Sequence, residues 1–273
     1  METVAPGIRV VPVRTPTLPP ATHTNTYVVG EGALSVFDPA SPWDDERQRL
    51  HTALAERLEQ GERVERIVLT HHHDDHVAGA EDLRRRLGGA VPIAAHPVTA
   101  RLVADRITVD LLLEPEAPLA CGDRTLTPQF TPGHAPGHLV FLDEASGAVI
   151  AGDMVAGVGT ILISPVDGDL GAYLDSLEAM RRRSPTVLLP AHGPALHEAD
   201  AVLAFYIAHR HQRTEQIRTA LDRQGAATAE ALAASVYPEL PREAHSLAAA
   251  QILSHLRWME RHGLARPEGA RWV

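Results

Sequence analysis

Short apolar runs alternate with amphipathic stretches along the first two hundred residues of the chain. Thr26–Val29 and Leu34–Phe37 are β-rich runs joined through the letters GEGA, which predicts a hairpin. The stretch Trp43–Gly61 has acidic residues at its start, apolar residues at helical spacing and a terminal glycine, so it predicts a helix. Val64–Leu69 is rich in Val, Ile and Leu and predicts the next strand.

The same alternation continues to about residue 190. The sequence predicts a helix over Ala80–Leu87 and strands over Val91–Ala95, Val140–Leu142, Ala148–Ile150 and Val187–Leu189. Several of these strands border on His or Asp, and loops at strand ends are where α/β proteins commonly place their chemistry.

From about Ala201 the composition changes to Ala, His and Arg at helical spacing. A long helix over Tyr206–Gly225, a short helix that Thr228 caps, a third helix over Pro241–Leu264 and a small β-wing in ARPEGARWV follow one another. This order is typical of a winged helix. We therefore expect two domains, a catalytic domain over residues 1–200 and a winged-helix-like domain over residues 201–273.

Composition supports an ordinary globular protein. A chain of 273 residues with 44% hydrophobic and 22% charged residues can bury a full core and is too mixed for disorder. The single cysteine, Cys121, excludes an intramolecular disulfide and fits a reducing compartment. Because no signal-peptide pattern follows Met1 and no apolar run reaches roughly 18 residues, we expect a soluble, cytoplasmic protein without membrane partners.

The charge is strongly acidic in the first part of the chain. Residues 1–200 hold 16 Arg against 28 Asp and Glu, whereas residues 201–273 hold 9 Arg against 7 acidic residues. A net charge of −10 argues against broad affinity for nucleic acid, because phosphate binding depends on cationic side chains, although it leaves room for a local basic patch.

The densest chemistry lies in LTHHHDDHVAG, residues Leu69–Gly79, directly after a predicted strand. Alternate residues in an extended loop point the same way, so His71 and His73 can direct two imidazoles at one metal. Asp75 and His76 lie slightly further on and can reach a second metal. Two metals need more ligands than this loop holds, and the candidates are the strand-end residues His134, Asp153 and His192.

These motifs resemble those of the metallo-β-lactamase superfamily. THHHDDH matches the T-H-x-H-x-D-H signature, and TPGHAPGH, GD and PAHGP match the later ligand motifs in order over roughly Thr22–Pro194. The resemblance implies an αββα sandwich in which His71, His73 and His134 hold the first metal. It implies that Asp75, His76 and His192 hold the second and that Asp153 bridges both, while His138 fits a supporting role.

Two divalent metals a few ångströms apart can lower the pKa of a shared water and prepare it for attack on a carbonyl or phosphoryl centre. Asp75 would orient that water and accept its proton. Zinc suits the imidazole and carboxylate ligands, and iron or manganese are alternatives.

The subgroup resemblance narrows the substrate without fixing it. Asp75 and His76 at the second site differ from typical secreted β-lactamases, which usually have a cysteine there, and the set is similar to that of glyoxalase II. The tail resembles the lactamase-like subgroup with a C-terminal winged helix, whose members include thioesterases and an endoribonuclease for single-stranded RNA. Hydrolysis of a small or carrier-bound ester or thioester is the leading hypothesis, and RNA cleavage is the alternative.

Two other hypotheses belong to different classes. One is an iron-dependent persulfide dioxygenase, which the complete two-metal ligand set disfavours, and the other is a binding module without catalysis. The helix that begins near Ala201 is a candidate surface for a homodimer.

Overall fold

The structure is a computed structural model that describes residues 1–241 and 244–273. Its residues form two compact units. The first unit comprises Met1–Thr131, Pro136–Ile161 and Arg183–Asp200, and the second comprises Pro132–Ala135, Leu162–Arg182 and Ala201–Val273. The division into domains 1–200 and 201–273 stays a prediction, since the second unit also includes two earlier segments.

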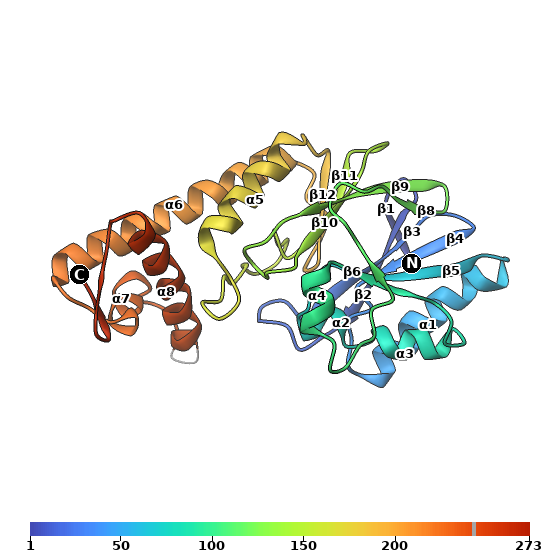
Figure 1. Ribbon diagram of the computed structural model, residues 1–273, viewed down its shortest axis with the longest axis horizontal. Helices are drawn as coiled ribbons and strands as arrows, with labels where there is room; N and C mark the ends of the chain where they lie inside the picture. Colours follow the sequence, from blue (N-terminus) through green and yellow to red (C-terminus); the bar gives the residue numbers. More distant parts are fainter. Residues whose placement is uncertain (242–243) are drawn as a thin grey trace. The chain divides into compact units, whose positions relative to one another are not determined.

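Two β-sheets make up the first unit (Figure 1). The seven-stranded sheet has the order β1 (Glu2–Ala5), β2 (Ile8–Arg14), β3 (His23–Val29), β4 (Ala33–Phe37), β5 (Arg63–Leu69), β6 (Ile93–Ala95) and β7 (Leu111–Leu112). The five-stranded sheet has the order β12 (Val187–Pro190), β11 (Ala148–Gly152), β10 (Leu139–Asp143), β9 (Arg124–Phe130) and β8 (Leu119–Cys121). Strands β4 to β7 run parallel to one another, as do β11 and β12.

Apolar side chains fill both faces of the seven-stranded sheet. On one face, Leu34, Ile67 and Leu69 pack with Leu50 and Leu54 of helix α1, and further residues of α3 belong to the same core. The helices of this unit are α1 (Asp44–Glu59), α2 (Asp74–Val77), α3 (Ala80–Arg86) and α4 (Pro97–Leu102).

The opposite face of the sheet packs on the five-stranded sheet. Phe37 and Phe141 are fully buried there, with ring centroids 5.0 Å apart in an edge-to-face arrangement. Because the sheet is covered on both sides, the buried ends of β4 and β5, Val36–Phe37 and Ile67–Leu69, are continuous apolar runs.

The main elements predicted for the first two hundred residues are confirmed. The predicted hairpin is β3 and β4, the predicted helix at residue 43 is α1, and the strand before the histidines is β5. Strands β1, β2, β7, β8 and β9 were not predicted. Pro12 interrupts β2 and Pro128 interrupts β9, which weakens the strand pattern.

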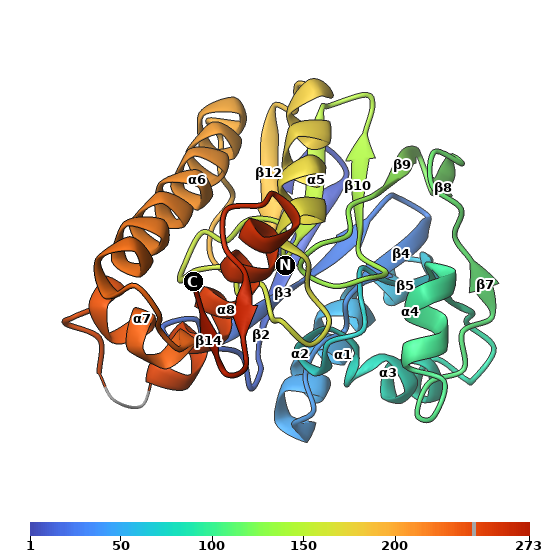
Figure 2. The same ribbon diagram turned by 60° about the vertical axis from the view of Figure 1, so that its left-hand side comes forward.

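The second unit contains a three-helix core with a β-wing (Figure 2). Its elements are α5 (Leu170–Arg182), most of α6 (Ala199–Gln224), α7 (Ala229–Val236), α8 (His245–Arg261), β13 (Pro267–Glu268) and β14 (Arg271–Trp272). Ile217, Leu232, Ile252 and Trp272 share one apolar cluster. Thr228 caps α7 as predicted, through its side-chain oxygen and the backbone N–H of Ala231.

Two predictions about these helices need adjustment. The first long helix begins earlier than predicted, at Ala199, and the third helix is shorter than the predicted span 241–264. Positions 242 and 243 of that span lie outside the described residues. Among the residues that the structure describes, no helix is long and apolar enough to cross a membrane.

A buried histidine lies between α6 and α8 of the second unit. His255 is fully buried, and its Nδ1 lies 2.8 Å from Oγ1 of Thr214. Since the Thr214 hydroxyl donates to the carbonyl of Arg210, its oxygen accepts from His255 Nδ1. Burial, together with the nearby guanidinium groups of Arg210 and Arg213, lowers the pKa of His255 to about 3.

We therefore predict that acid destabilises the second unit through His255. The folded pKa of about 3 lies below the ordinary 6.5, so the unfolded chain binds a proton between these values that the folded unit does not. The free energy of opening α8, measured by hydrogen exchange, should be up to about 2 kcal/mol lower at pH 5 than at pH 7.

The variant His255→Gln removes the titrating group and should flatten this dependence. His262→Gln, which changes an exposed histidine just after α8, is the matched control and should keep the slope of the wild type. Equal slopes in all three proteins would contradict the assignment.

Candidate metal centre

The candidate site is built at the carboxyl ends of four strands in the first unit. Asp38 follows β4 and His71 follows β5 by two residues, and these strands are parallel neighbours. Asp153 follows β11 and His192 follows β12 by two residues, and these strands are also parallel neighbours. Parallel strands end at the same edge of their sheet, which explains why residues far apart in the sequence meet here.

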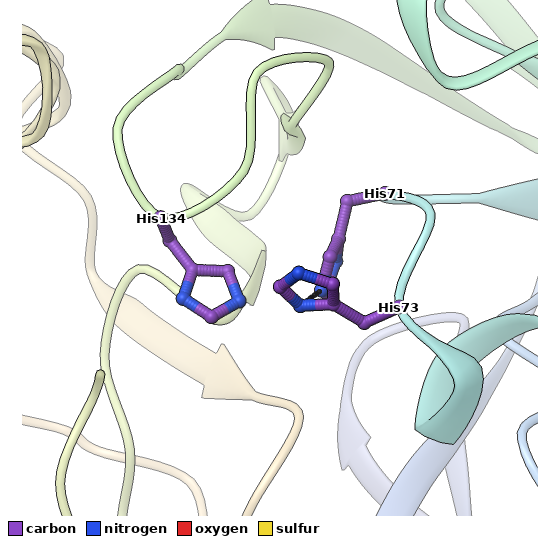
Figure 3. Close-up of side chains that lie close together, drawn as sticks. All are labelled: His71, His73 and His134. Atoms are coloured by element: carbon purple, nitrogen blue, oxygen red, sulfur yellow. Dashed lines mark hydrogen bonds between the residues drawn. The ribbon is translucent and has the colours of Figure 1, made fainter. Parts of the chain in front are cut away.

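His71, His73 and His134 form one group whose candidate ligand atoms all lie within 4.8 Å of one another. Figure 3 shows their three imidazole rings converging. Nε2 of His71 and Nδ1 of His73 are 3.0 Å apart. His134 belongs to the short segment Pro132–Ala135, whose neighbours Thr131 and Pro136 both belong to the first unit.

Asp75, His76 and His192 form a second group with the same spread of ligand atoms. Asp75 and His76 are held by the one-turn helix α2, which begins directly after His73. The Oδ2 atom of Asp75 lies 3.6 Å from Nε2 of His192.

Asp153 lies beside members of both groups. It forms a further candidate group with His71 and His76, and its Oδ1 lies 3.4 Å from the Nε2 atoms of both His76 and His192. Its bridging role stays a prediction.

The buried carboxylate of Asp38 orients residues of this cluster through hydrogen bonds to Thr70 and His76. It accepts hydrogen bonds from the backbone N–H of Thr70 at 2.8 Å, from the Thr70 hydroxyl at 2.7 Å and from Nδ1 of His76 at 2.9 Å. With Nδ1 held by Asp38, the Nε2 atom of His76 faces Asp153. The backbone of Asp38 has a φ of 48°, an uncommon value for a residue other than glycine, and such outliers cluster at functional sites.

Two other imidazoles are oriented in the same way by backbone carbonyls. Nδ1 of His192 donates to the carbonyl of His23 at 2.9 Å, and Nδ1 of His134 donates to the carbonyl of Leu162 at 2.9 Å. In the neutral form of each ring, Nε2 is then the nitrogen that can bind a metal.

His138 supports Asp153 through the backbone. Its Nε2 accepts the backbone N–H of Asp153 at 3.1 Å, and its Nδ1 bonds to Oγ1 of Thr131 at 2.9 Å. A Cβ atom at Gly152 would lie 2.5 Å from Nε2 of His138, so only glycine permits this approach. The supporting role predicted for His138 agrees with these contacts.

The electrostatics of the cluster reflect its close spacing. Burial opposes the charge on His76, but the carboxylates of Asp153 and Asp38 hold its pKa well above the usual value. Burial likewise opposes the charge on Asp153, but His76 and His192 hold its pKa well below the usual value. Opposite charges in one buried cluster stabilise each other.

The residues fit divalent metal ions. Nε2 of His76 is buried and has no hydrogen-bond partner among the described residues. Imidazole nitrogens and carboxylate oxygens suit zinc and similar ions, and two ligands about 2.1 Å from one tetrahedral ion lie about 3.4 Å apart. The separations of 3.0 to 3.6 Å in the cluster are close to that value.

All seven predicted ligand residues thus lie in the candidate groups, and their individual roles stay predictions. Asp74 points away and pairs with Arg106. Asp38 was not among the predicted site residues, although its place after an apolar strand run was a usable signal. Thr17 was not predicted either: its Oγ1 lies 3.4 Å from Nε2 of His192, and the sequence carries no signal for that contact.

Comparisons with known proteins identify both parts of the chain. Residues 19–192 match the family model described as the metallo-beta-lactamase superfamily, and residues 228–272 match the beta-lactamase associated winged helix domain. Similar curated proteins include the lactamase-like protein vrtG of Penicillium aethiopicum, 31% identical over 86% of this chain and 75% of its own. Another is the beta-lactamase-like protein 2 homolog of Drosophila melanogaster, 28% identical over 89% and 84%.

Solved structures share the fold. A metallo-beta-lactamase family protein from Thermus thermophilus is 23% identical over 99% of both chains, with a TM-score of 0.81. A beta-lactamase domain protein from Burkholderia ambifaria is 22% identical over 100% of this chain and 92% of its own, with a TM-score of 0.87. The predicted fold class, including the winged helix, is confirmed.

We predict that Asp38→Asn weakens metal binding. The asparagine side chain has one acceptor oxygen for the three groups that donate to Asp38, and its NH2 group would face at least one of these donors. The ring of His76 therefore loses the hydrogen bond that orients it. Loss of such an outer partner typically costs 10–100-fold in metal affinity, measurable by titration against a chromophoric chelator.

The control for this experiment is Asp143→Asn. Asp143 is equally buried but pairs with Arg124, away from the cluster. If Asp38→Asn binds metal with wild-type affinity and its circular dichroism is unchanged, the proposed role of Asp38 is contradicted.

Proposed function

The chain belongs to the metallo-β-lactamase superfamily, and on that basis we propose that it is a two-metal hydrolase of carboxylic esters or thioesters. Members of this superfamily are generally metal-dependent hydrolases. The observation that carries the proposal is the pair of ligand groups with Asp153 beside both.

The proposed site divides its work among the residues of the cluster. One divalent ion would be held by His71, His73 and His134. The other would be held by Asp75, His76 and His192, and Asp153 would contact both ions. Zinc is the expected metal. Such a pair supplies Lewis acidity and activates water. Asp75 accepts the proton of the attacking water, since its side chain is partly exposed while those of His76 and Asp153 are nearly buried.

Charge favours a carbonyl substrate over a polyanion. The chain has a net charge of −10, which opposes the approach of a polyanion. On helix α8, Arg261 forms a two-point ion pair with Asp169, so its charge is already matched by a carboxylate.

Cleavage of single-stranded RNA is the second candidate, and the winged helix favours it because this motif commonly binds nucleic acid. The two candidates differ in their response to salt. RNA binding weakens steeply with ionic strength, whereas a small neutral acyl substrate is nearly insensitive to it.

We predict that Asp75→Asn lowers turnover of an acyl thioester by at least about 100-fold, the contribution of a positioned general base. The zinc-loaded protein is assayed with a thioester panel and with labelled single-stranded RNA at low and high salt. The metal content of each variant is measured, so that loss of metal is distinguished from loss of the base.

Asp74→Asn provides a matched control, since the neighbouring carboxylate is exposed and pairs with Arg106. It should keep wild-type turnover. Salt-sensitive cleavage of RNA that Asp75→Asn abolishes, without thioester cleavage, would overturn the ester proposal in favour of the ribonuclease.

A further inference from the structure

The loop between β2 and β3 lies against the second ligand group. Its base is closed by a hydrogen bond from the Thr15 N–H to the Thr22 carbonyl at 3.2 Å and by the Thr15 and Thr24 hydroxyls, 2.8 Å apart. Near its tip, Oγ1 of Thr17 lies 3.4 Å from Nε2 of His192. The next residue, Leu18, is 44% exposed.

A second segment touches the same histidine from its backbone side. The N–H groups of Gly157 and Val158 both donate to the carbonyl of His192, at 2.7 and 3.2 Å. A Cβ atom at Gly193 would lie 2.6 Å from the backbone nitrogen of Val158, so glycine is required for this approach. Val158 is 38% exposed.

The two segments are also close to each other. A Cβ atom at Gly159 would lie 3.5 Å from Cδ of Pro20, an ordinary van der Waals distance. Leu18 and Val158 are therefore two exposed apolar side chains in adjacent segments. Leu18 follows a residue that contacts His192, and Val158 is itself bonded to that histidine. We name this pair the acyl rim.

The chemistry of both segments is uncharged. Residues 16–22 and 155–160 contain no ionisable side chain, although the catalytic part of the chain is rich in Asp and Glu. Three prolines restrict the backbone of the first segment, so little conformational entropy is lost when a ligand packs on it. A surface of this kind attracts an alkyl chain and offers no cation to a phosphate or carboxylate.

We propose that the acyl rim, Leu18 and Val158, binds the aliphatic chain of the acyl group and favours longer acyl chains over acetyl. This inference rests on the proposed ester or thioester hydrolysis. A chain packed on a partly exposed rim gains about half the free energy of complete burial, so kcat/KM should rise about twofold for each methylene.

The test measures kcat/KM for N-acetylcysteamine thioesters from acetyl to decanoyl in the zinc-loaded protein. Leu18→Ala and Val158→Ala should each flatten the rise with chain length and leave the acetyl ester within about twofold of wild type. Leu111→Ala is the matched control, because Leu111 is 42% exposed on β7, at the edge of the sheet opposite to β1 and β2. It should keep the wild-type slope.

A second readout separates this inference from the proposed function. Non-hydrolysable S-alkyl thioethers of N-acetylcysteamine are titrated calorimetrically into wild type and Leu18→Ala, with and without metal. The acyl rim is supported, even if no thioester is cleaved, when binding strengthens with alkyl length in wild type but not in Leu18→Ala. Parallel slopes in wild type and both rim variants in turnover, or in wild type and Leu18→Ala in binding, would overturn the acyl rim while leaving any observed hydrolysis intact.

Discussion

The carboxylate of Asp38 is the contact on which the candidate centre depends. It joins the end of β4 to the loop after β5 by accepting two hydrogen bonds from Thr70, and it fixes the ring of His76 with a third. Through the Thr70 hydroxyl it also orients His71, whose Nδ1 lies 3.0 Å from that oxygen. One buried anion therefore sets the direction of two imidazoles, one from each ligand group.

A cluster of buried charges is tolerable only where the surrounding structure holds it in place. Strands β4 and β5 are packed on both faces, and the edge-to-face pair of Phe37 and Phe141 links the two sheets close to Asp38. The apolar core thus supplies rigidity, while the strand ends supply the ligands. The uncharged loop that reaches His192 adds a surface suited to a neutral substrate, which agrees with the acidic charge of the chain.

All seven residues predicted as ligands fall in the candidate groups, because histidines and aspartates are concentrated in short motifs at strand ends, from His71 to His76 within six positions. The main parallel strands were predictable because each contains a short run of apolar residues. Asp38 and Thr17 were out of reach for a physical reason: their roles arise from contacts with residues 32 and 175 positions away. Strand β2 was not predicted because a proline lies within it. Its pairing with β3, over seven residues, exists only in the tertiary structure.

The most direct test of this account is anomalous X-ray diffraction at the zinc edge from crystals of the zinc-loaded protein. We predict two peaks, one enclosed by His71, His73 and His134 and the other by Asp75, His76 and His192, with Asp153 in contact with both. A single peak, or no peak in either group, would contradict a two-metal centre.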